Sequence, residues 1–180
     1  MTPFWEEVAK ARAPDDALSD AQLFCQAVLP STGHFCIQPL LHGRPGRARW
    51  LATHEEAARV AIELDRAGAG DIYLAIASFG EGKERREEAV RCKRDFYLDL
   101  DVGPQKPFPD KRTAVLALRQ FTLNSGVPFP AILVDSGNGL HAHWPLDRDL
   151  ELGEWRKAVG LILVSLRRGL GRLTAIRGSH

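Results

Sequence analysis

The stretch Tyr97-Leu-Asp-Leu-Asp-Val102 decides how the fold of this chain is interpreted. Acidic and apolar residues alternate along it, and alternate side chains of a β-strand point to opposite faces of a sheet. The pattern predicts a strand over Phe96–Val102, with Asp99 and Asp101 on one face and the apolar side chains in the core. Two carboxylates about 7 Å apart on one face repel each other unless a cation neutralises them. Mg²⁺ or Mn²⁺ suits such oxygen ligands, although a plain surface pair is the alternative interpretation.

A second informative stretch is Asp135-Ser-Gly-Asn-Gly-Leu-His-Ala-His-Trp144. Ser136–Gly139 between two apolar runs predicts a tight hairpin turn, with Asn138-Gly139 suited to positive φ. Such a turn also exposes backbone N–H groups beside a serine hydroxyl, and these donors suit phosphate oxygens. Beyond the turn, alternation puts His141 and His143 on one strand face. A histidine there can bond to a triphosphate oxygen, and a purely structural role stays open.

The first half of the chain is predicted to be an α/β unit. Ser19 is a plausible N-cap for its first helix, and Thr53-His-Glu-Glu56 has the pattern of a capping box that opens a second helix. Gly80–Arg91 is highly charged and is interpreted as a loop or a weak exposed helix. The predicted elements are a helix over Asp20–Val28, strands over His34–Leu40 and Ala48–Ala52, a helix from Thr53 to Gly68, and a strand over Asp71–Phe79.

The second half has a more regular rhythm. Its predicted elements are a strand over Phe96–Val102, a helix that Asp110 caps and that runs to about Asn124, strands over Ala131–Asp135 and Leu140–Leu146, and a helix over Leu152–Arg168. The order β-α-β-β-α lacks only the last strand of a ferredoxin-like split βαβ unit, for which Leu173–Ile176 is a candidate. In such a unit the first and third strands are neighbours. Asp99, Asp101 and His141 are therefore expected to line one open sheet face and to form a nucleotidyl-transfer site.

The predicted fold class is α+β, with a central, mostly antiparallel sheet whose open face carries the site. An N-terminal α/β unit, residues 19–92, is expected to pack on a ferredoxin-like, RRM-like βαββα(β) unit, residues 93–176, within one domain over 1–176. Residues 177–180 are interpreted as the remnant of a purification tag.

Composition narrows the function classes. The chain has 180 residues, 44% apolar and 26% charged, with a net charge of +1, so it belongs to the ordinary globular proteins. It contains no run of about 18 apolar residues and no secretory signal pattern. Its three cysteines have no CxxC spacing, which favours reduced thiols over a disulfide or zinc framework. We expect a cytoplasmic protein without a membrane partner.

The two stretches together resemble the first two catalytic motifs of the archaeo-eukaryotic primase superfamily. The similarity is to Phe96-Tyr-Leu-Asp-Leu-Asp-Val-Gly103, then a proline-rich loop and a helix, then Ser136-Gly-Asn-Gly-Leu-His141. The nearest resemblance is to primase-polymerases of plasmids, phages and other mobile elements, and Ala21–Phe79 also looks like their N-terminal α/β unit. The resemblance implies synthesis or extension of primers on a single-stranded DNA template, from NTPs or dNTPs, with Mg²⁺ or Mn²⁺. A helicase or another replication protein is a further candidate partner.

The resemblance also implies roles for individual residues. Asp99 and Asp101 would be metal ligands, and Ser136 and His141 would contact the phosphates of the incoming nucleotide. Gly137 and Gly139, with Asn138 between them, would allow that nucleotide to approach closely. The weaker candidates for phosphate or template contact are Lys93, Arg94 and His143.

One departure from the family concerns the third acidic residue, which normally follows the last helix. Leu173-Thr-Ala-Ile176 contains no Asp or Glu, so the chain resembles a catalytic domain that stops before this motif, and metal affinity and turnover are expected to suffer. Two alternatives stay open. One is a weak or inactive module that binds nucleotides or single-stranded nucleic acid. The other is a rolling-circle replication nuclease, because His141-Ala-His143 loosely fits its His-hydrophobic-His element.

Overall fold

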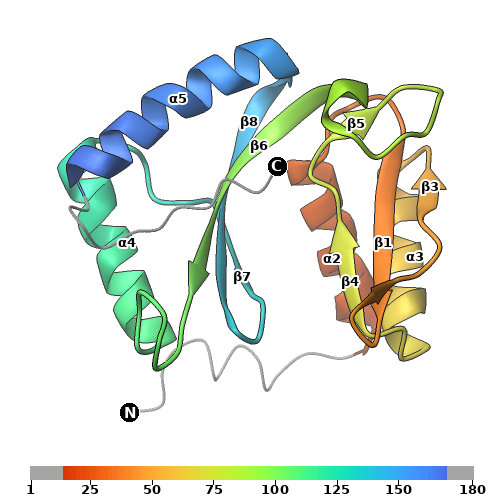
Figure 1. The fold of residues 1–180 in the computed structure, drawn as a ribbon, viewed down its shortest axis with the longest axis horizontal. Coiled ribbons are helices and arrows are strands. Elements are labelled where there is room, and N and C mark those ends of the chain that lie inside the picture. The colour runs from red at the N-terminus through yellow and green to blue at the C-terminus, as the bar shows by residue number, and fades with distance from the viewer. Residues whose placement is uncertain (1–13, 170–180) are drawn as a thin grey trace. The chain divides into compact units, whose positions relative to one another are not determined.

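The computed structural model describes residues 14–169 and, among these, the side chains of residues 18–162 (Figure 1). The described chain is a mixed α+β structure with four α-helices and antiparallel sheets. It divides into two compact units, with the boundary after Lys93. No helix in the described range is long and apolar enough to cross a membrane.

The first unit is built on β1 (Phe35–Leu41), which is buried along most of its length. Antiparallel partners pair with β1 on both of its edges, and helix α3 packs against the sheet while α2 packs against α3. These elements are β2 (Arg44–Pro45), β3 (Arg49–Leu51), β4 (Asp71–Leu74), α2 (Pro14–Val28) and α3 (His54–Arg66). The strands predicted over His34–Leu40 and Ala48–Ala52 are present as β1 and β3, which pair with each other.

Two predictions for this unit are wrong. Ser19 lies inside α2, which already begins at Pro14, a residue whose fixed φ suits the first helical position. The predicted strand over Asp71–Phe79 is two strands, because β4 pairs with β1 whereas β5 (Ser78–Phe79) pairs with the start of β6 (Val90–Asp101). A run of apolar residues predicts strand structure, but it does not show whether the whole run pairs with a single neighbouring strand.

The predicted N-cap of α3, Thr53, is confirmed, whereas the Glu56 side chain bonds to the residue before the cap rather than to the cap itself, as a capping box would require. The Thr53 hydroxyl accepts a hydrogen bond of 3.1 Å from the Glu56 N–H, and the Glu56 carboxylate accepts one of 2.9 Å from the Ala52 N–H. The cysteines of the described chain are free thiols. Burial, with a smaller contribution from the Glu55 charge, raises the pKa of Cys25 to about 11.

The second unit contains β8 (Gly139–Glu151) and most of β6 (Val90–Asp101), which begins in the last residues of the first unit. The strand β6 follows a short 3₁₀ turn (Glu87–Ala89) at the end of the charged loop, and pairs first with β5 and then with β8. The strands of the second unit lie in the order β6-β8-β7. Its other elements are α4 (Lys111–Ser125), β7 (Ile132–Asp135) and α5 (Leu152–Gly169). Residues 173–176 and 177–180, for which a final strand and a tag were predicted, lie outside the described range.

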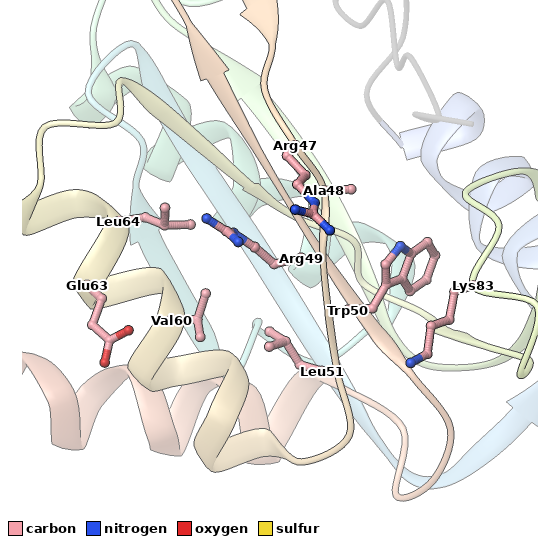
Figure 2. Close-up of a pocket in the computed structure, with 9 residues that line it drawn as sticks. All are labelled: Arg47, Ala48, Arg49, Trp50, Leu51, Val60, Glu63, Leu64 and Lys83. Atoms are coloured by element: carbon pink, nitrogen blue, oxygen red, sulfur yellow. The ribbon is translucent and has the colours of Figure 1, made fainter.

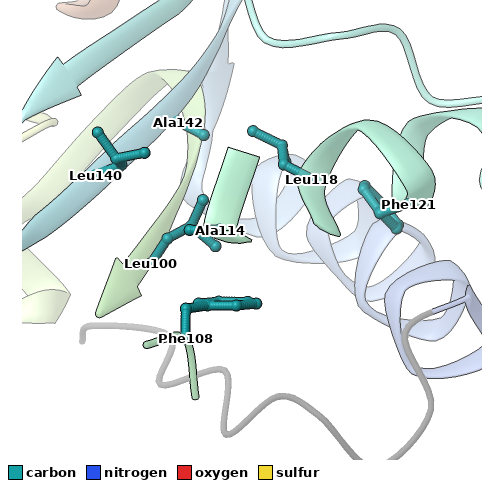
Figure 3. Close-up of a cluster of buried hydrophobic side chains, with 7 residues drawn as sticks. All are labelled: Leu100, Phe108, Ala114, Leu118, Phe121, Leu140 and Ala142. Atoms are coloured by element: carbon teal, nitrogen blue, oxygen red, sulfur yellow. The ribbon is translucent and has the colours of Figure 1, made fainter. Parts of the chain in front are cut away.

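Alternation in β6 and β8 separates a core face from a polar face. Leu100, Leu140 and Ala142 belong to one buried cluster with residues of α4, as Figure 3 shows. The whole cluster is Leu100, Phe108, Ala114, Leu118, Phe121, Leu140 and Ala142. The Asp110 carboxylate caps α4 by accepting a 2.7 Å hydrogen bond from the Thr113 N–H, as predicted. The odd-numbered side chains of β6 and β8 are left for the opposite face of the sheet.

Candidate functional site

The polar face brings the two sequence motifs together. Asp99 on β6 and His141 on β8 lie on adjacent strands, and the Oδ1 of the aspartate is 3.7 Å from the Nε2 of the histidine. This separation suits an ion pair and is too long for a hydrogen bond. The side chains are 51% and 37% exposed, so both remain accessible to a ligand from solvent.

Asp101 continues the same face at the end of β6. Its Oδ2 accepts a 3.0 Å hydrogen bond from the Nζ of Lys106, which lies on the proline-rich loop. A backbone hydrogen bond from Lys106 to Gly103 and one from Gly103 to Phe108 close this loop. Lys106 was not among the candidate residues that the sequence motifs indicated. The available signal was a lysine five residues after Asp101 in a loop short enough to fold back.

Some of the backbone N–H groups in the turn after β7 already donate hydrogen bonds to neighbouring residues. The Ser136 N–H donates to the Gly139 carbonyl at 3.2 Å, and the Gly137 N–H donates to the Asp135 carboxylate at 2.8 Å. The Asn138 carbonyl accepts a 3.1 Å bond from the Val102 N–H, so the turn lies beside the end of β6. Ser136 and Asn138 are exposed at this position, where the Ser136 hydroxyl is available to a ligand.

Gly137 and Gly139 of the turn each meet a different structural requirement for glycine. The left-handed φ of +83° belongs to Gly137 rather than to the predicted Asn138-Gly139 pair. A Cβ on Gly139 would lie 2.5 Å from the Leu100 carbonyl oxygen. Gly139 is therefore required for the close approach of β8 to β6, which aligns His141 with Asp99.

Asp135 and Lys111 form a second ion pair next to the turn. The Nζ of Lys111 is 2.7 and 2.8 Å from the two carboxylate oxygens of Asp135. The hydrogen bond from Lys111, helped by the Gly137 N–H and the lysine charge, holds the pKa of Asp135 below its ordinary value. The first residue of α4 is thereby tied to the turn over Ser136–Gly139.

Deeper on the same face lies a buried cluster that the sequence analysis missed in part. The Nδ1 of His143 is 2.6 Å from the Oδ2 of Asp95, and these residues are 2% and 1% exposed. The ring of Tyr97 stacks on His143 at 5.5 Å and lies 6.4 Å from the ring of His141. Tyr97 and Asp95 lie two and four residues before Asp99 in the same odd-numbered series. Tyr97 is already within the predicted strand, and extending the alternation by one further step would have found Asp95.

The remaining candidates have less direct links to this face. Arg94 donates from Nε to the Leu146 carbonyl at 3.1 Å, which fastens β6 to β8. Lys93 is half-buried on β6 at the end of the first unit. The two histidines of the His-Ala-His element face different carboxylates, Asp95 and Asp99, and do not converge on one point as two ligands of a single metal would.

The donor set at Asp99 and Asp101 fits a hard divalent cation in part. Both carboxylates are about half exposed and offer oxygen ligands, which Mg²⁺ and Mn²⁺ prefer. The described residues contain no group of three or more His, Cys, Asp or Glu side chains able to hold a metal ion. Water or phosphate oxygens would therefore have to complete the coordination.

Comparisons with known proteins do not extend this description: no family model, curated protein or solved structure matches the chain.

Proposed function

We propose that the chain is a nucleotidyl-transfer domain that synthesises or extends primers on a single-stranded DNA template, from NTPs or dNTPs with Mg²⁺ or Mn²⁺. The observation that carries this proposal is the 3.7 Å separation between Asp99 and His141. A carboxylate suited to a cation and an imidazole suited to a phosphate oxygen thus lie side by side, as binding of a nucleotide together with its cation requires. They come from the two stretches that resemble the primase motifs.

The arrangement of the second unit also supports the expected ferredoxin-like, RRM-like fold. The strand order β6-β8-β7, with α4 between β6 and β7 and α5 after β8, is the order expected for a ferredoxin-like, RRM-like unit without its last strand. Such an order makes the first and third strands neighbours. The motif residues then share one face for a topological reason.

Each residue has a defined part in the proposed site. Asp99 and Asp101 would hold the cation, which when bound would activate the attacking 3′ hydroxyl and neutralise phosphate charge. His141 would donate from its imidazole to a phosphate oxygen, and the exposed Ser136 hydroxyl would donate to another. The Lys106 ammonium, 3.0 Å from Asp101, offsets the repulsion between the two carboxylates and keeps them compatible on one strand.

A calorimetric titration of a nucleoside triphosphate in the presence of Mn²⁺ tests the proposal. The wild-type chain is expected to bind, and Asp99→Asn/Asp101→Asn is expected to lose binding because it lacks both anionic ligands. Asp147→Asn is the matched control, since it removes an exposed carboxylate elsewhere on β8 and should leave the affinity unchanged. Equal binding by the double variant and the wild type would contradict the site.

Incorporation of labelled nucleotide on a single-stranded template separates the enzyme from the binding module. Template-dependent products that disappear in Asp99→Asn/Asp101→Asn would support nucleotidyl transfer. Nucleotide binding without incorporation, even at high Mn²⁺, would support the inactive module instead. A DNA strand covalently attached to Tyr73 or Tyr97 would support the nuclease alternative.

A further inference from the structure

A cavity of about 610 Å³ lies on the first unit, and none of the residues assigned above lines it. The residues of β3 line it, and β3 pairs with β1 along one edge and with no other strand of the described chain. Figure 2 shows Arg49 extending from β3 toward Leu64 of α3, and Trp50 on the other side of the strand, near Lys83. The nine lining residues are Arg47, Ala48, Arg49, Trp50, Leu51, Val60, Glu63, Leu64 and Lys83.

The side chains that line this pocket carry an excess of positive charge. Arg47, Arg49 and Lys83 line it against a single acid, Glu63, and Glu63 is already paired with Arg59 at 2.7 Å. Within residues 18–162, the structure gives Arg47 and Arg49 no hydrogen bond or ion pair from their guanidinium groups. Arg47 and Arg49 are both exposed and are two residues apart, so their Cα atoms are about 7 Å apart. Their guanidinium groups can therefore bind separate anionic oxygens of one ligand.

The pocket also offers a flat apolar surface. Trp50 is held in position by an edge-to-face contact with Phe79, with ring centroids 5.4 Å apart and an interplanar angle of 87°. Leu51, Val60 and Leu64 supply aliphatic contacts. Arg49 and Trp50 lie on opposite sides of β3, so a ligand that contacts both lies across the edge of this strand that is unpaired in the described chain. A planar ring joined to phosphate suits this arrangement, since aromatic side chains stack on bases and arginine binds phosphate through two parallel hydrogen bonds.

We propose that this pocket is a binding site for a nucleotide group, meaning a planar base with its phosphate, supplied either by a free nucleotide or by the 5′-phosphorylated end of a strand. Its volume lies within the range of about 300–1,000 Å³ that is usual for small-ligand sites. Arg47 and Arg49 bind the phosphate, and Trp50, across the edge of β3, contacts the base. The proposal does not depend on the nucleotidyl-transfer site, because no residue is shared between them.

Quenching of tryptophan fluorescence in EDTA tests the proposal, because chelation keeps the cation-dependent site silent. The probes are adenosine 5′-diphosphate, unphosphorylated adenosine, and a single strand of about ten nucleotides with and without a 5′-phosphate. The wild type is expected to bind at least one phosphorylated probe more tightly than its unphosphorylated partner. Binding of the diphosphate assigns a free nucleotide, and binding of the phosphorylated strand alone assigns a strand end.

Variants locate the binding. Arg47→Gln/Arg49→Gln should weaken it by at least about tenfold, the equivalent of 1.4 kcal/mol, and Trp50→Phe should remove the quenching. Arg44→Gln, an exposed arginine outside the pocket, and Asp99→Asn/Asp101→Asn should each stay within about twofold of the wild type. Absence of binding by every probe, full affinity in the double arginine variant, or an equal loss in Arg44→Gln would each overturn the proposal.

Discussion

The Nδ1 of His143 lies 2.6 Å from the Oδ2 of Asp95, and both side chains are almost completely buried. The two residues belong to neighbouring strands, β8 and β6, so their contact joins the strands that carry the two motifs. Tyr97 stacks on His143 and lies close to His141. The buried pair thereby supports the more exposed pair formed by Asp99 and His141.

We expect His143→Ala to lower the free energy of unfolding by about 3 kcal/mol, because it removes the imidazole that compensates a buried carboxylate. Urea unfolding followed by circular dichroism measures this change. His141→Ala, on the same strand face but partly exposed, should cost less than about 1 kcal/mol. Equal small losses in the two variants would mean that the buried pair contributes little to stability.

Gly139→Ala should destabilise the second unit by about 2 kcal/mol or more. The added Cβ would meet the Leu100 carbonyl 2.5 Å away, so β6 and β8 would have to separate, and metal-dependent triphosphate binding should fall with stability. Gly160→Ala is the control, because its Cβ would meet nothing within 4 Å on the exposed side of α5. That change should stabilise by about 0.5–1 kcal/mol through helix propensity; a loss as large as that of Gly139→Ala would refute the steric explanation.

His141→Ala tests the proposed contact with the phosphate chain. We expect the affinity for a nucleoside triphosphate to fall by about tenfold through loss of a charge-assisted hydrogen bond, while the affinity for the corresponding monophosphate changes little. Titration of both nucleotides with Mn²⁺ into the wild type and the variant measures the difference. Parallel losses for the two nucleotides would remove His141 from the outer phosphates.

Lys111→Met should alter the dependence of stability on pH in acid. In the folded chain Lys111 lowers the pKa of Asp135 below its ordinary value of 3.8, so the ionised carboxylate stabilises the fold above this pH. That contribution is lost as the pH falls through the folded pKa. The pair is partly exposed, so the difference between the wild type and Lys111→Met should be below about 1 kcal/mol at neutral pH.

Urea unfolding at several pH values between about 6 and 2 measures this dependence. The free energy of unfolding should fall more steeply with acid in the wild type than in Lys111→Met, and the two should converge at the lowest pH. Parallel curves over the whole range would show that the ion pair is not maintained in solution.

Local patterns predicted the elements that local physics controls. Thr53 and Asp110 were identified as helix caps because a cap needs only a side-chain oxygen and the N–H three residues further on. The faces of β6 followed from alternation alone. The strand over Asp71–Phe79 failed for the opposite reason, since its division into β4 and β5 depends on two partner strands from different parts of the chain.

The sequence by itself determined that Asp99 and Asp101 share one face of their strand, and that His141 and His143 share one face of theirs. It also determined that a glycine turn precedes the histidines. The tertiary structure alone decided which carboxylate pairs with which histidine: Asp99 with His141, and Asp95 with His143. It also supplied Lys106 and Lys111 as partners for the acids. The physical reason is that side-chain direction follows from backbone geometry within a strand, whereas contacts between strands depend on register, which only the packing of distant segments fixes.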